Sequence, residues 1–256
     1  MTKSKMVATS ATLLVLFIAL VFIVQEALPQ DQSLVNKLSQ TYGNGQAYFR
    51  GIKTYRAQIL LTEYNDGKCK GTERVLCIYN QQPLRLYFKW MHGGPYEGLQ
   101  ASYDINRDGP EHFLALETGI RGLIGVQSWH LDSRIIYGLY PHNFRINEYC
   151  LGFLLNHVIS IHNNAIAKNT IQVQDKGYST SLIPGLKLRV YDIKLSDDPS
   201  GGVLYSRSVV GIDERTDMPR FVESYDFNGK LQLSYKIIAF EPNATLDPSI
   251  FELKKE

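Results

Sequence analysis

The sequence predicts an α+β fold in which one antiparallel sheet packs against one or two helices, with a hydrophobic helix at the N-terminus. Three observations lead to this prediction. In the C-terminal quarter, apolar and polar side chains alternate along several runs, which is the pattern of strands with one buried face. Asn228-Gly229 lies between two of these runs and marks a two-residue hairpin, because both residue types tolerate positive φ. Residues 147–162 instead carry apolar side chains at helical spacing, which indicates a helix with one apolar face.

Residues 1–30 are interpreted as an export signal or a membrane anchor. Two lysines precede an uncharged stretch, residues 6–24, whose length suits either a Sec-type signal or a single bilayer crossing. Cleavage after Ala27 and retention as an anchor both stay open. No cysteine directly follows the apolar run, which excludes a lipoprotein signal. Residues 31–256 are then expected to form a single antiparallel β domain.

The next segment is expected to be helical and then extended. Asp31 or Ser33 caps a short amphipathic helix, and Gly43-Asn44-Gly45 is expected to end it. A helical or extended piece, 46–51, leads into a strand over 53–63. One face of this strand carries Tyr55, Ala57, Ile59 and Leu61.

The first half continues as a meander of strands. Asn65-Asp66-Gly67 turns the chain, and Pro83 begins a strand whose apolar side chains alternate with polar ones. The expected strands cover residues 73–79, 83–90, 98–104 and 112–117. Residues 118–141 are rich in glycine, and part of them is expected to form a lid or a crossover.

The second half begins with the helix over residues 147–162, which is expected to fill the inner side of the sheet. A short strand over residues 170–174 follows it. Four further strands are then expected, at residues 186–192, 203–213, 220–227 and 230–239.

Composition supports one sizeable core and excludes some classes of partner. Of the 256 residues, 44% are hydrophobic, the formal net charge is +2, and 16 tyrosines suit strands. No basic cluster is interleaved with aromatic residues, so no nucleic-acid partner is predicted. No cofactor is predicted either.

Motifs that carry chemistry are weak. The segment Asp104–Gly109 resembles the start of a calcium loop, but Ala115 occupies the position of the required glutamate, so a plain hairpin loop is favoured. His157 and His162 are five residues apart, which places them on different helix faces, and ordinary surface or cap histidines are favoured over a metal site. No nucleophile elbow or phosphate loop occurs. Paired carboxylates stay open, since four acidic residues could meet: Glu97, Asp104, Glu117 and Asp132.

The three cysteines leave one disulfide open. Cys69 and Cys77 are expected to flank the turn of one hairpin, close enough for a disulfide in an oxidising compartment. The alternative is a loop thiol at Cys69 and a small buried side chain at Cys77. Cys150, at the start of the apolar helix, is expected in the core.

The order of turns and strands also carries a resemblance. An acidic turn, Asp213–Pro219, leads into a strand, then Asp226–Lys230, another strand and a closing Leu246–Leu253 segment. Together with Gly98–Tyr103 and Tyr140-Pro141, this resembles an uncharacterised bacterial envelope family that is similar to the LolA/LolB-like lipoprotein carriers. The resemblance spans about residues 33–256. It implies a curved half-barrel sheet wrapped around helices, with an apolar cavity inside.

The resemblance and the export segment together predict a non-enzymatic protein of the bacterial cell envelope. It would lie in the periplasm or at the periplasmic face of the inner membrane, and would bind a lipid or a lipoprotein acyl chain. The candidate cavity residues are Leu84, Leu86, Phe88, Trp90, Leu151, Leu154, Leu155, Leu231, Leu233 and Tyr235. A solid core is the alternative reading of the same residues. A membrane-tethered scaffold for a protein partner and an envelope hydrolase are the other functions left open.

Overall fold

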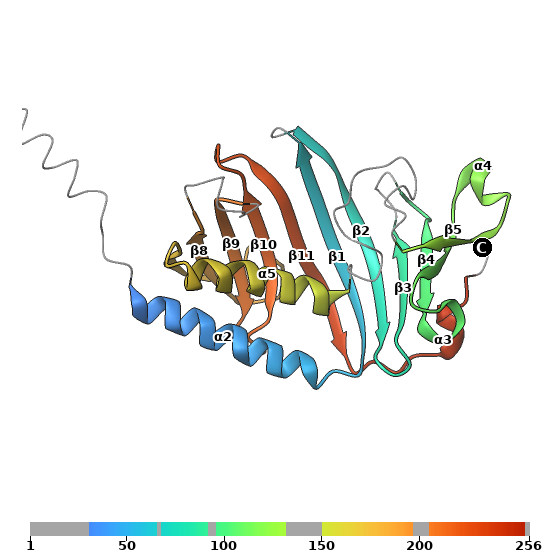
Figure 1. The fold of residues 1–256 in the computed structure, drawn as a ribbon, viewed down its shortest axis with the longest axis horizontal. Coiled ribbons are helices and arrows are strands. Elements are labelled where there is room, and N and C mark those ends of the chain that lie inside the picture. Colours follow the sequence, from blue (N-terminus) through green and yellow to red (C-terminus); the bar gives the residue numbers. More distant parts are fainter. Residues whose placement is uncertain (1–30, 66–67, 92–95, 132–149, 197–204, 254–256) are drawn as a thin grey trace, which may run out of the picture. The chain divides into compact units, whose positions relative to one another are not determined.

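The computed structural model describes residues 31–65, 68–91, 96–131, 150–196 and 205–253. Within these ranges the chain forms an open antiparallel sheet with two long helices on one face (Figure 1). This confirms the predicted fold class, a curved sheet wrapped around helices. The predicted N-terminal segment, residues 1–30, lies outside the described ranges. In the described part of the chain, no helix is both long and apolar enough to cross a bilayer.

Eleven strands pair side by side in the described sheet. They are β1 (Thr54–Asn65), β2 (Lys68–Asn80), β3 (Arg85–Trp90), β4 (Gln100–Asp104), β5 (His112–Leu116), β6 (Val126–His130), β7 (Gln172–Ser179), β8 (Leu188–Lys194), β9 (Arg207–Asp213), β10 (Pro219–Tyr225) and β11 (Leu231–Pro242). Their spatial order is β6-β5-β4-β3-β2-β1-β11-β10-β9-β8-β7. The chain therefore builds two meanders, and these join where β1 pairs with β11 in the centre of the sheet.

The inner face of the sheet follows the period-two pattern of the sequence. Along β1, the four side chains expected on one face, Tyr55, Ala57, Ile59 and Leu61, are all buried. Ile59 lies opposite Ile237 of β11, and Leu61 lies opposite Tyr235. Because the residues of such a pair lie close together on one face, the join between the meanders is also a packed part of the core.

Helix α2 (Gln32–Arg50) is continuous, so the predicted break at Gly43-Asn44-Gly45 is wrong. Glycine costs a helix only about 1 kcal/mol relative to alanine, and tertiary packing of one apolar face can offset that cost. Gly45 is buried, and a Cβ atom there would lie 2.4 Å from the backbone oxygen of Asp217. The glycine therefore permits a close approach between α2 and the turn that connects β9 and β10.

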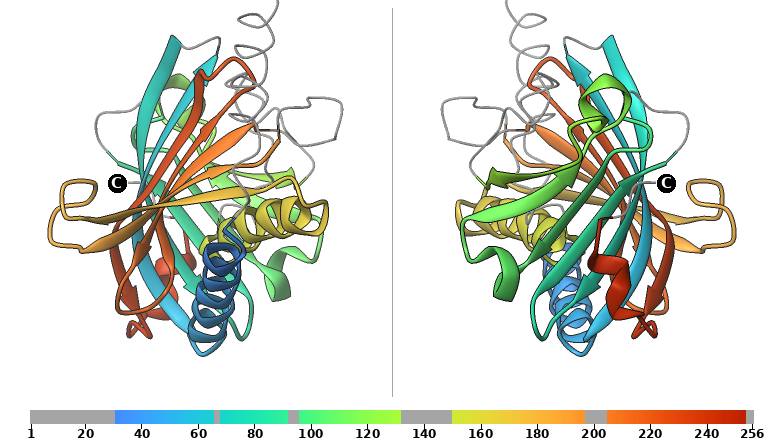
Figure 2. Two further views of the ribbon diagram at one scale, coloured as in Figure 1. Left: turned by 90° about the vertical axis from the view of Figure 1, so that its left-hand side faces the viewer. Right: turned by 90° about the vertical axis from the view of Figure 1, so that its right-hand side faces the viewer.

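Helix α5 (Leu151–Ala167) lies on the same face of the sheet as α2 (Figure 2). It begins a few residues later than the sequence predicts and extends five residues beyond His162. Its apolar side is buried against the sheet, with Leu151, Leu155 and Ile159 among the most deeply buried residues. Full burial of each such side chain stabilises the fold by roughly 1.5–3 kcal/mol.

The outer face has a smaller core of its own. Ile78 of β2 and Tyr87 of β3 pack there with Phe251, which belongs to the short 3₁₀ helix η3 (Pro248–Phe251). The Ser102 hydroxyl donates a hydrogen bond of 2.5 Å to the Phe251 backbone oxygen. The C-terminal segment therefore returns to the sheet, on the side opposite to α2 and α5.

Two connections differ from the expectation. Part of the glycine-rich region 118–141 forms the helix α4 (Gly119–Gly122) and the edge strand β6, whereas residues 132–149 lie outside the described ranges. The turn between β10 and β11 is longer than a two-residue hairpin: Tyr225 pairs with Leu231, and of the pair Asn228-Gly229 only the glycine has positive φ. The Asp226 carboxylate accepts backbone hydrogen bonds within this turn, which fixes its longer form.

Candidate functional site

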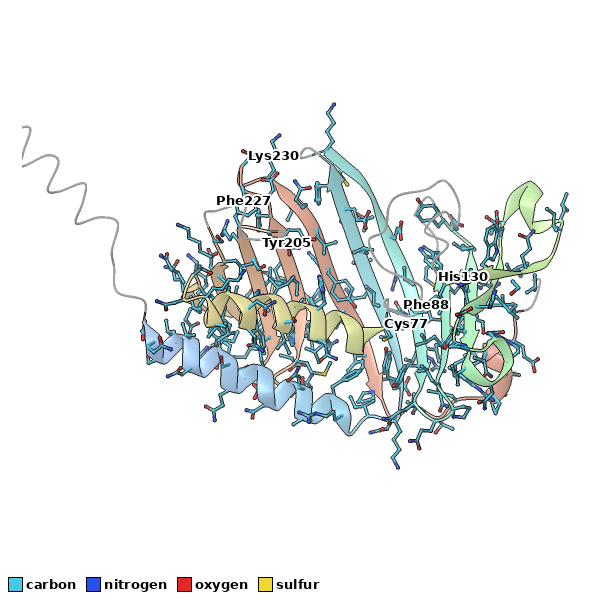
Figure 3. The ribbon with its side chains drawn as sticks, viewed as in Figure 1. Cys77, Phe88, His130, Tyr205, Phe227 and Lys230 are labelled. Atoms are coloured by element: carbon cyan, nitrogen blue, oxygen red, sulfur yellow. The ribbon has the colours of Figure 1, made fainter. Side chains whose placement is uncertain are left out.

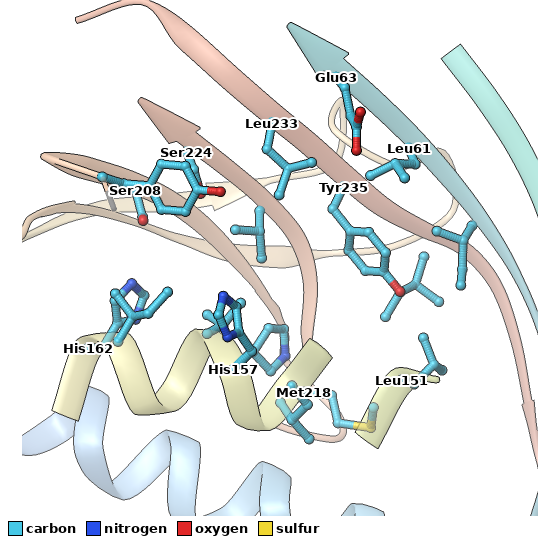
Figure 4. A pocket seen from close by; sticks show the side chains of 18 of the residues that line it. Leu61, Glu63, Leu151, His157, His162, Ser208, Met218, Ser224, Leu233 and Tyr235 are labelled. Carbon is cyan, nitrogen blue, oxygen red and sulfur yellow. The ribbon is translucent and has the colours of Figure 1, made fainter. Parts of the chain in front are cut away.

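A cavity lies between α5 and the inner face of the sheet (Figure 4). Its volume, counted as the space open to the centre of a water molecule, is about 60 Å³. The described residues that line it are Ile59, Leu61, Glu63, Val75, Phe88, Leu151, Leu155, His157, Val158, Ile161, His162, Tyr205, Ser208, Met218, Pro219, Val222, Ser224, Leu233, Tyr235 and Ile237. Most of these side chains are apolar, which suits hydrocarbon better than a polar solute.

The strand register explains why these side chains converge. Ile59 and Leu61 lie on the inner face of β1, and Glu63 continues the same face. On the paired strand β11, Tyr235 and Leu233 stand opposite Leu61 and Glu63. Side chains two residues apart share one face of a strand, so β1 and β11 together form a continuous wall of the cavity.

Two tyrosine hydroxyls hold α5 over this wall. The Tyr55 hydroxyl on β1 accepts a hydrogen bond of 2.9 Å from the Leu151 backbone N–H, at the first residue of α5. That N–H belongs to the free end of a helix, where no intrahelical partner exists. The side chain of Cys150, the N-cap residue, does not cap the helix by a hydrogen bond, and Tyr55 on β1 satisfies this N–H instead. Burial raises the pKa of the Tyr55 hydroxyl, which keeps it neutral.

The second hydroxyl belongs to Tyr42 on α2. It lies 2.6 Å from Nδ1 of His162, and the two rings stack with their centroids 5.6 Å apart. His162 is 1% exposed, so the expectation of a surface or cap histidine is wrong for this residue. Burial lowers the pKa of His162 to about 3, because its apolar surroundings disfavour the charged imidazolium. His162 is therefore a neutral side chain of the cavity wall that also ties α5 to α2.

Three hydroxyls of buried residues lie on the wall opposite α5, those of Tyr235, Ser208 and Ser224. The Tyr235 hydroxyl is fully buried and without a partner. Ser208 of β9 and Ser224 of β10 stand opposite each other in the register, and both are buried. Buried hydroxyls in proteins are normally hydrogen-bonded. This wall is therefore apolar overall but carries hydroxyl groups, of which that of Tyr235 is buried without a partner.

Charge is sparse around the cavity. No lysine or arginine is among the described residues that line it, and Glu63 is the charged side chain there. Glu63 lies near Tyr205, and both burial and the negative charge of Glu63 raise the pKa of the Tyr205 hydroxyl. The cavity is thus neutral along most of its wall and has one acidic end.

The sequence predicted ten cavity residues, and the structure brings five of them to the cavity: Phe88, Leu151, Leu155, Leu233 and Tyr235. Leu86 and Trp90 are buried in the main core, while Leu84 and Leu231 are partly buried; none of these four lines the cavity. Leu154 belongs to α5, and its side chain lies outside the described ones.

Sequence reasoning missed several lining residues that the same pattern could have identified. Ile59 and Leu61 already stood on the predicted inner face of β1. Val222 and Ser224 alternate in the same way on β10. Ser208 and His162 gave no such signal, because a serine and a histidine inside apolar runs do not mark a cavity.

The disulfide left open between Cys69 and Cys77 does not form, and both are free thiols. Both residues lie on β2, with Cys69 opposite Tyr64 and Cys77 opposite Ala57. Eight residues along a strand span roughly 26 Å, far beyond the distance a disulfide can bridge. Cys77 is buried beside Phe88 of β3 (Figure 3), and burial raises the pKa of its thiol.

The candidate carboxylates are divided between the two ends of β4. Glu97 precedes this strand, and Glu117 follows β5, whose end lies beside the start of β4. Asp104 lies at the other end, where it forms a 2.7 Å ion pair with Arg85 and caps the short helix α3 (Ile105–Asp108). The segment favoured as a hairpin loop thus contains α3. Asp132 lies outside the described residues.

Among the described residues, no group of histidine, cysteine and acidic side chains is arranged to hold a metal ion. His157 and His162 both line the cavity, although their spacing places them on different sides of α5. His112 and His130 meet at the edge of the sheet instead, with ring centroids 5.2 Å apart.

Comparisons with known proteins agree with the resemblance inferred from the sequence. A family model described as "Protein of unknown function (DUF1571)" matches residues 52–255. No curated protein matches the sequence of this chain.

Solved structures of low sequence identity are similar along most of the chain. An uncharacterized conserved protein from Thermus thermophilus is 8% identical, with a TM-score of 0.43, over 89% of this chain and 96% of that one. The Mycobacterium tuberculosis lipoprotein LppX is 10% identical, with a TM-score of 0.47, over 83% of this chain and 98% of that one. A LolA superfamily protein from Nitrosomonas europaea is 9% identical, with a TM-score of 0.35, over 88% of this chain and 98% of that one. Similarities of this size decide nothing about ligand or partner.

Proposed function

We propose that this chain, which belongs to the family described as "Protein of unknown function (DUF1571)", is a non-enzymatic protein that binds an acyl chain or a similar amphiphile. The binding site is the cavity between α5 and the inner face of the sheet. The observation that carries this proposal is the predominantly apolar lining of that cavity, contributed by α5 and by strands of both meanders.

The size of the cavity limits what it holds in this conformation. A buried water molecule requires about 10–15 Å³ of such volume, so about 60 Å³ accommodates roughly five groups of that size. A longer acyl chain therefore requires α5 to move away from the sheet. Few described side-chain hydrogen bonds oppose this movement: those of Tyr55 and Tyr42 and one of 3.1 Å between Gln46 and Asn156.

A cavity-filling variant tests the proposal. Val222→Phe places a larger side chain on the cavity wall, whereas Val209→Phe makes the same change on the outer face of the sheet and serves as the control. We expect the wild-type protein and Val209→Phe to bind the neutral fluorophore N-phenyl-1-naphthylamine and to release lipid on solvent extraction. We expect Val222→Phe to lose both properties while it still unfolds cooperatively in urea.

Two results would contradict the proposal. One is a wild-type protein that yields no lipid by mass spectrometry and does not bind the fluorophore. The other is a Val222→Phe variant that binds as tightly as the wild type.

As part of the same proposal, the protein acts in the bacterial envelope, in the periplasm or at the periplasmic face of the inner membrane. The support is the lysine-flanked apolar segment within residues 1–30. A measured mass of the intact protein that corresponds to cleavage of the signal near Ala27 would favour a diffusing carrier. A retained segment in the membrane fraction would favour a tethered protein.

One observation favours a second candidate, a tethered module that binds a protein partner. Leu123 and Ile124, between α4 and β6, are 74% and 72% exposed, and β6 is an edge strand of the described sheet. A photo-crosslinker at position 124 should then capture one defined partner in cells, and Leu123→Ser should abolish the capture. Unchanged capture in the Leu123→Ser variant would eliminate this candidate.

A further inference from the structure

The inference begins at Tyr235, whose hydroxyl is buried without a hydrogen-bond partner. Tyr235 lies on β11 and lines the cavity, and Figure 4 shows its ring reaching from the strand towards α5. Burial raises the pKa of this hydroxyl well above its usual value, so it is an O–H donor at neutral pH. A buried hydroxyl without a partner loses the hydrogen bonds that it made to water, which is unfavourable unless a ligand replaces them.

The two serines extend the same polar site. Ser208 and Ser224 are 3% and 4% exposed, and both line the cavity. Ser224 stands opposite Ser208 on one side and opposite Leu233 on the other, while Tyr235 is two residues beyond Leu233. Residues directly opposite each other in a sheet are about 5 Å apart and diagonal ones about 7–8 Å apart. One small polar group can therefore bind Ser208 and Ser224 together, while the Tyr235 hydroxyl, at the end of a ring that extends towards α5, offers a separate contact to another oxygen of the same ligand.

The charges around the cavity define which polar group fits. No described lining residue is a lysine or an arginine, and His162 is neutral at physiological pH. Glu63 contributes a negative charge at one end. The charge of buried Arg220 acts on the Tyr235 hydroxyl, but this guanidinium already binds the Asp213 carboxylate and the Ile237 backbone oxygen. A carboxylate or phosphate buried here would therefore find no lysine or arginine among the described lining residues, which is unfavourable in an apolar site. An ester or hydroxyl group has no such requirement.

We infer that the ligand is an uncharged amphiphile whose ester or hydroxyl oxygens bind Tyr235, Ser208 and Ser224, with its hydrocarbon part against the apolar wall. This inference rests on the proposed function and narrows it to one class of ligand. The three hydroxyls decide the position of the polar group, and the apolar wall supplies most of the affinity.

The test compares three ligands with equal chain length: 1-lauroylglycerol, laurate and dodecane, each below its aggregation limit at pH 8. Displacement of N-phenyl-1-naphthylamine from the purified protein reports their affinities. The variants are Tyr235→Phe and the double change Ser208→Ala with Ser224→Ala. The control for the tyrosine is Tyr191→Phe, because that hydroxyl is also buried without a partner but does not line the cavity. Ser234→Ala is the control for the serines, since Ser234 is buried outside the cavity.

We expect Tyr235→Phe to bind 1-lauroylglycerol about fivefold more weakly, which corresponds to one hydrogen bond, and to bind dodecane as the wild type does. The serine double variant should show a loss of similar size. Laurate should bind about tenfold more weakly than 1-lauroylglycerol to the wild type. Both control variants should keep wild-type affinities, and urea unfolding of each variant verifies that it is folded.

Each contrary outcome has a distinct meaning. Unchanged binding of 1-lauroylglycerol to Tyr235→Phe and to the serine double variant would overturn the inference, and so would laurate bound as tightly as the glyceride. An equal gain in affinity for all ligands in Tyr235→Phe would overturn it as well, because the hydroxyl would then bind only water. If no probe or ligand binds the wild type, the proposed function itself fails.

Discussion

Acid should destabilise this protein through one buried histidine. His162 has a pKa of about 3 in the folded state, against about 6.5 for an exposed histidine. Between these two values the unfolded chain takes up a proton and the folded chain does not. Stability from this residue is therefore complete above about pH 6.5 and falls as the pH is lowered, until the folded state is also protonated near pH 3.

The magnitude follows from the linkage between protonation and folding. Each pH unit below 6.5 costs about 1.4 kcal/mol, so a change from pH 8 to pH 4.5 should cost about 2.7 kcal/mol from His162 alone. That is a large fraction of the stability of a typical domain. The contribution should decrease if the Tyr42 hydroxyl rearranges to solvate the imidazolium.

Urea unfolding measured at several pH values tests this expectation. His162→Gln keeps a group that can accept a hydrogen bond from Tyr42 but does not titrate. All other titrating groups are common to both proteins, so the difference between their stability curves isolates His162. We expect the free energy of unfolding of the wild type to fall relative to that of the variant as the pH is lowered from 6.5 to 4.5. Parallel curves over this range would refute the reasoning.

Three further predictions follow from individual residues. Tyr55→Phe should lower the free energy of unfolding by about 1–3 kcal/mol, because the Leu151 N–H would lose its partner. Tyr235→Phe should leave the free energy of unfolding unchanged, because that hydroxyl has no partner to lose. Equal losses for the two variants in urea unfolding would contradict this. Gly45→Ala should destabilise the folded protein by about 1–3 kcal/mol, because the new Cβ would clash with the Asp217 backbone. Gly43→Ala should stabilise it by up to about 1 kcal/mol, because the space around Gly43 is open and alanine favours helix. Thermal unfolding that ranks the two variants in the opposite order would be contrary evidence. A thiol reagent should modify exposed Cys69 in the native protein and buried Cys77 only after unfolding, and peptide mapping that finds these two linked would disprove the assignment of free thiols.

The strands were predictable because their signal is local. The alternation along β1 correctly identified the buried face from Tyr55 to Leu61, and the same reasoning located the C-terminal meander. What decides these strands is the burial of one face, and that leaves a direct trace in the sequence. The same approach did not predict that α2 is continuous, because the packing that keeps the helix intact through Gly45 involves a turn about 170 residues away.

The cavity was predictable only in part, for a related reason. Phe88 and Tyr235 were expected on the inner face, but Leu86 and Trp90 share that pattern and fill the core instead. Alternation reports which face is buried and does not report whether a ligand or a neighbouring side chain covers it. His162 was misjudged because its environment is created by Tyr42, from a helix 120 residues earlier in the chain.

The pairing of β1 with β11 has a consequence for how the molecule is made. The Thr54 hydroxyl bonds the backbone oxygen of Ala244, 190 positions later, so the centre of the sheet closes only when nearly the whole chain is present. Contacts of such long range slow folding. Until β11 arrives, β1 has an unprotected edge that could pair with another chain. We therefore expect newly made protein to remain unfolded for an extended time, during which the β1 edge needs protection from pairing with other chains.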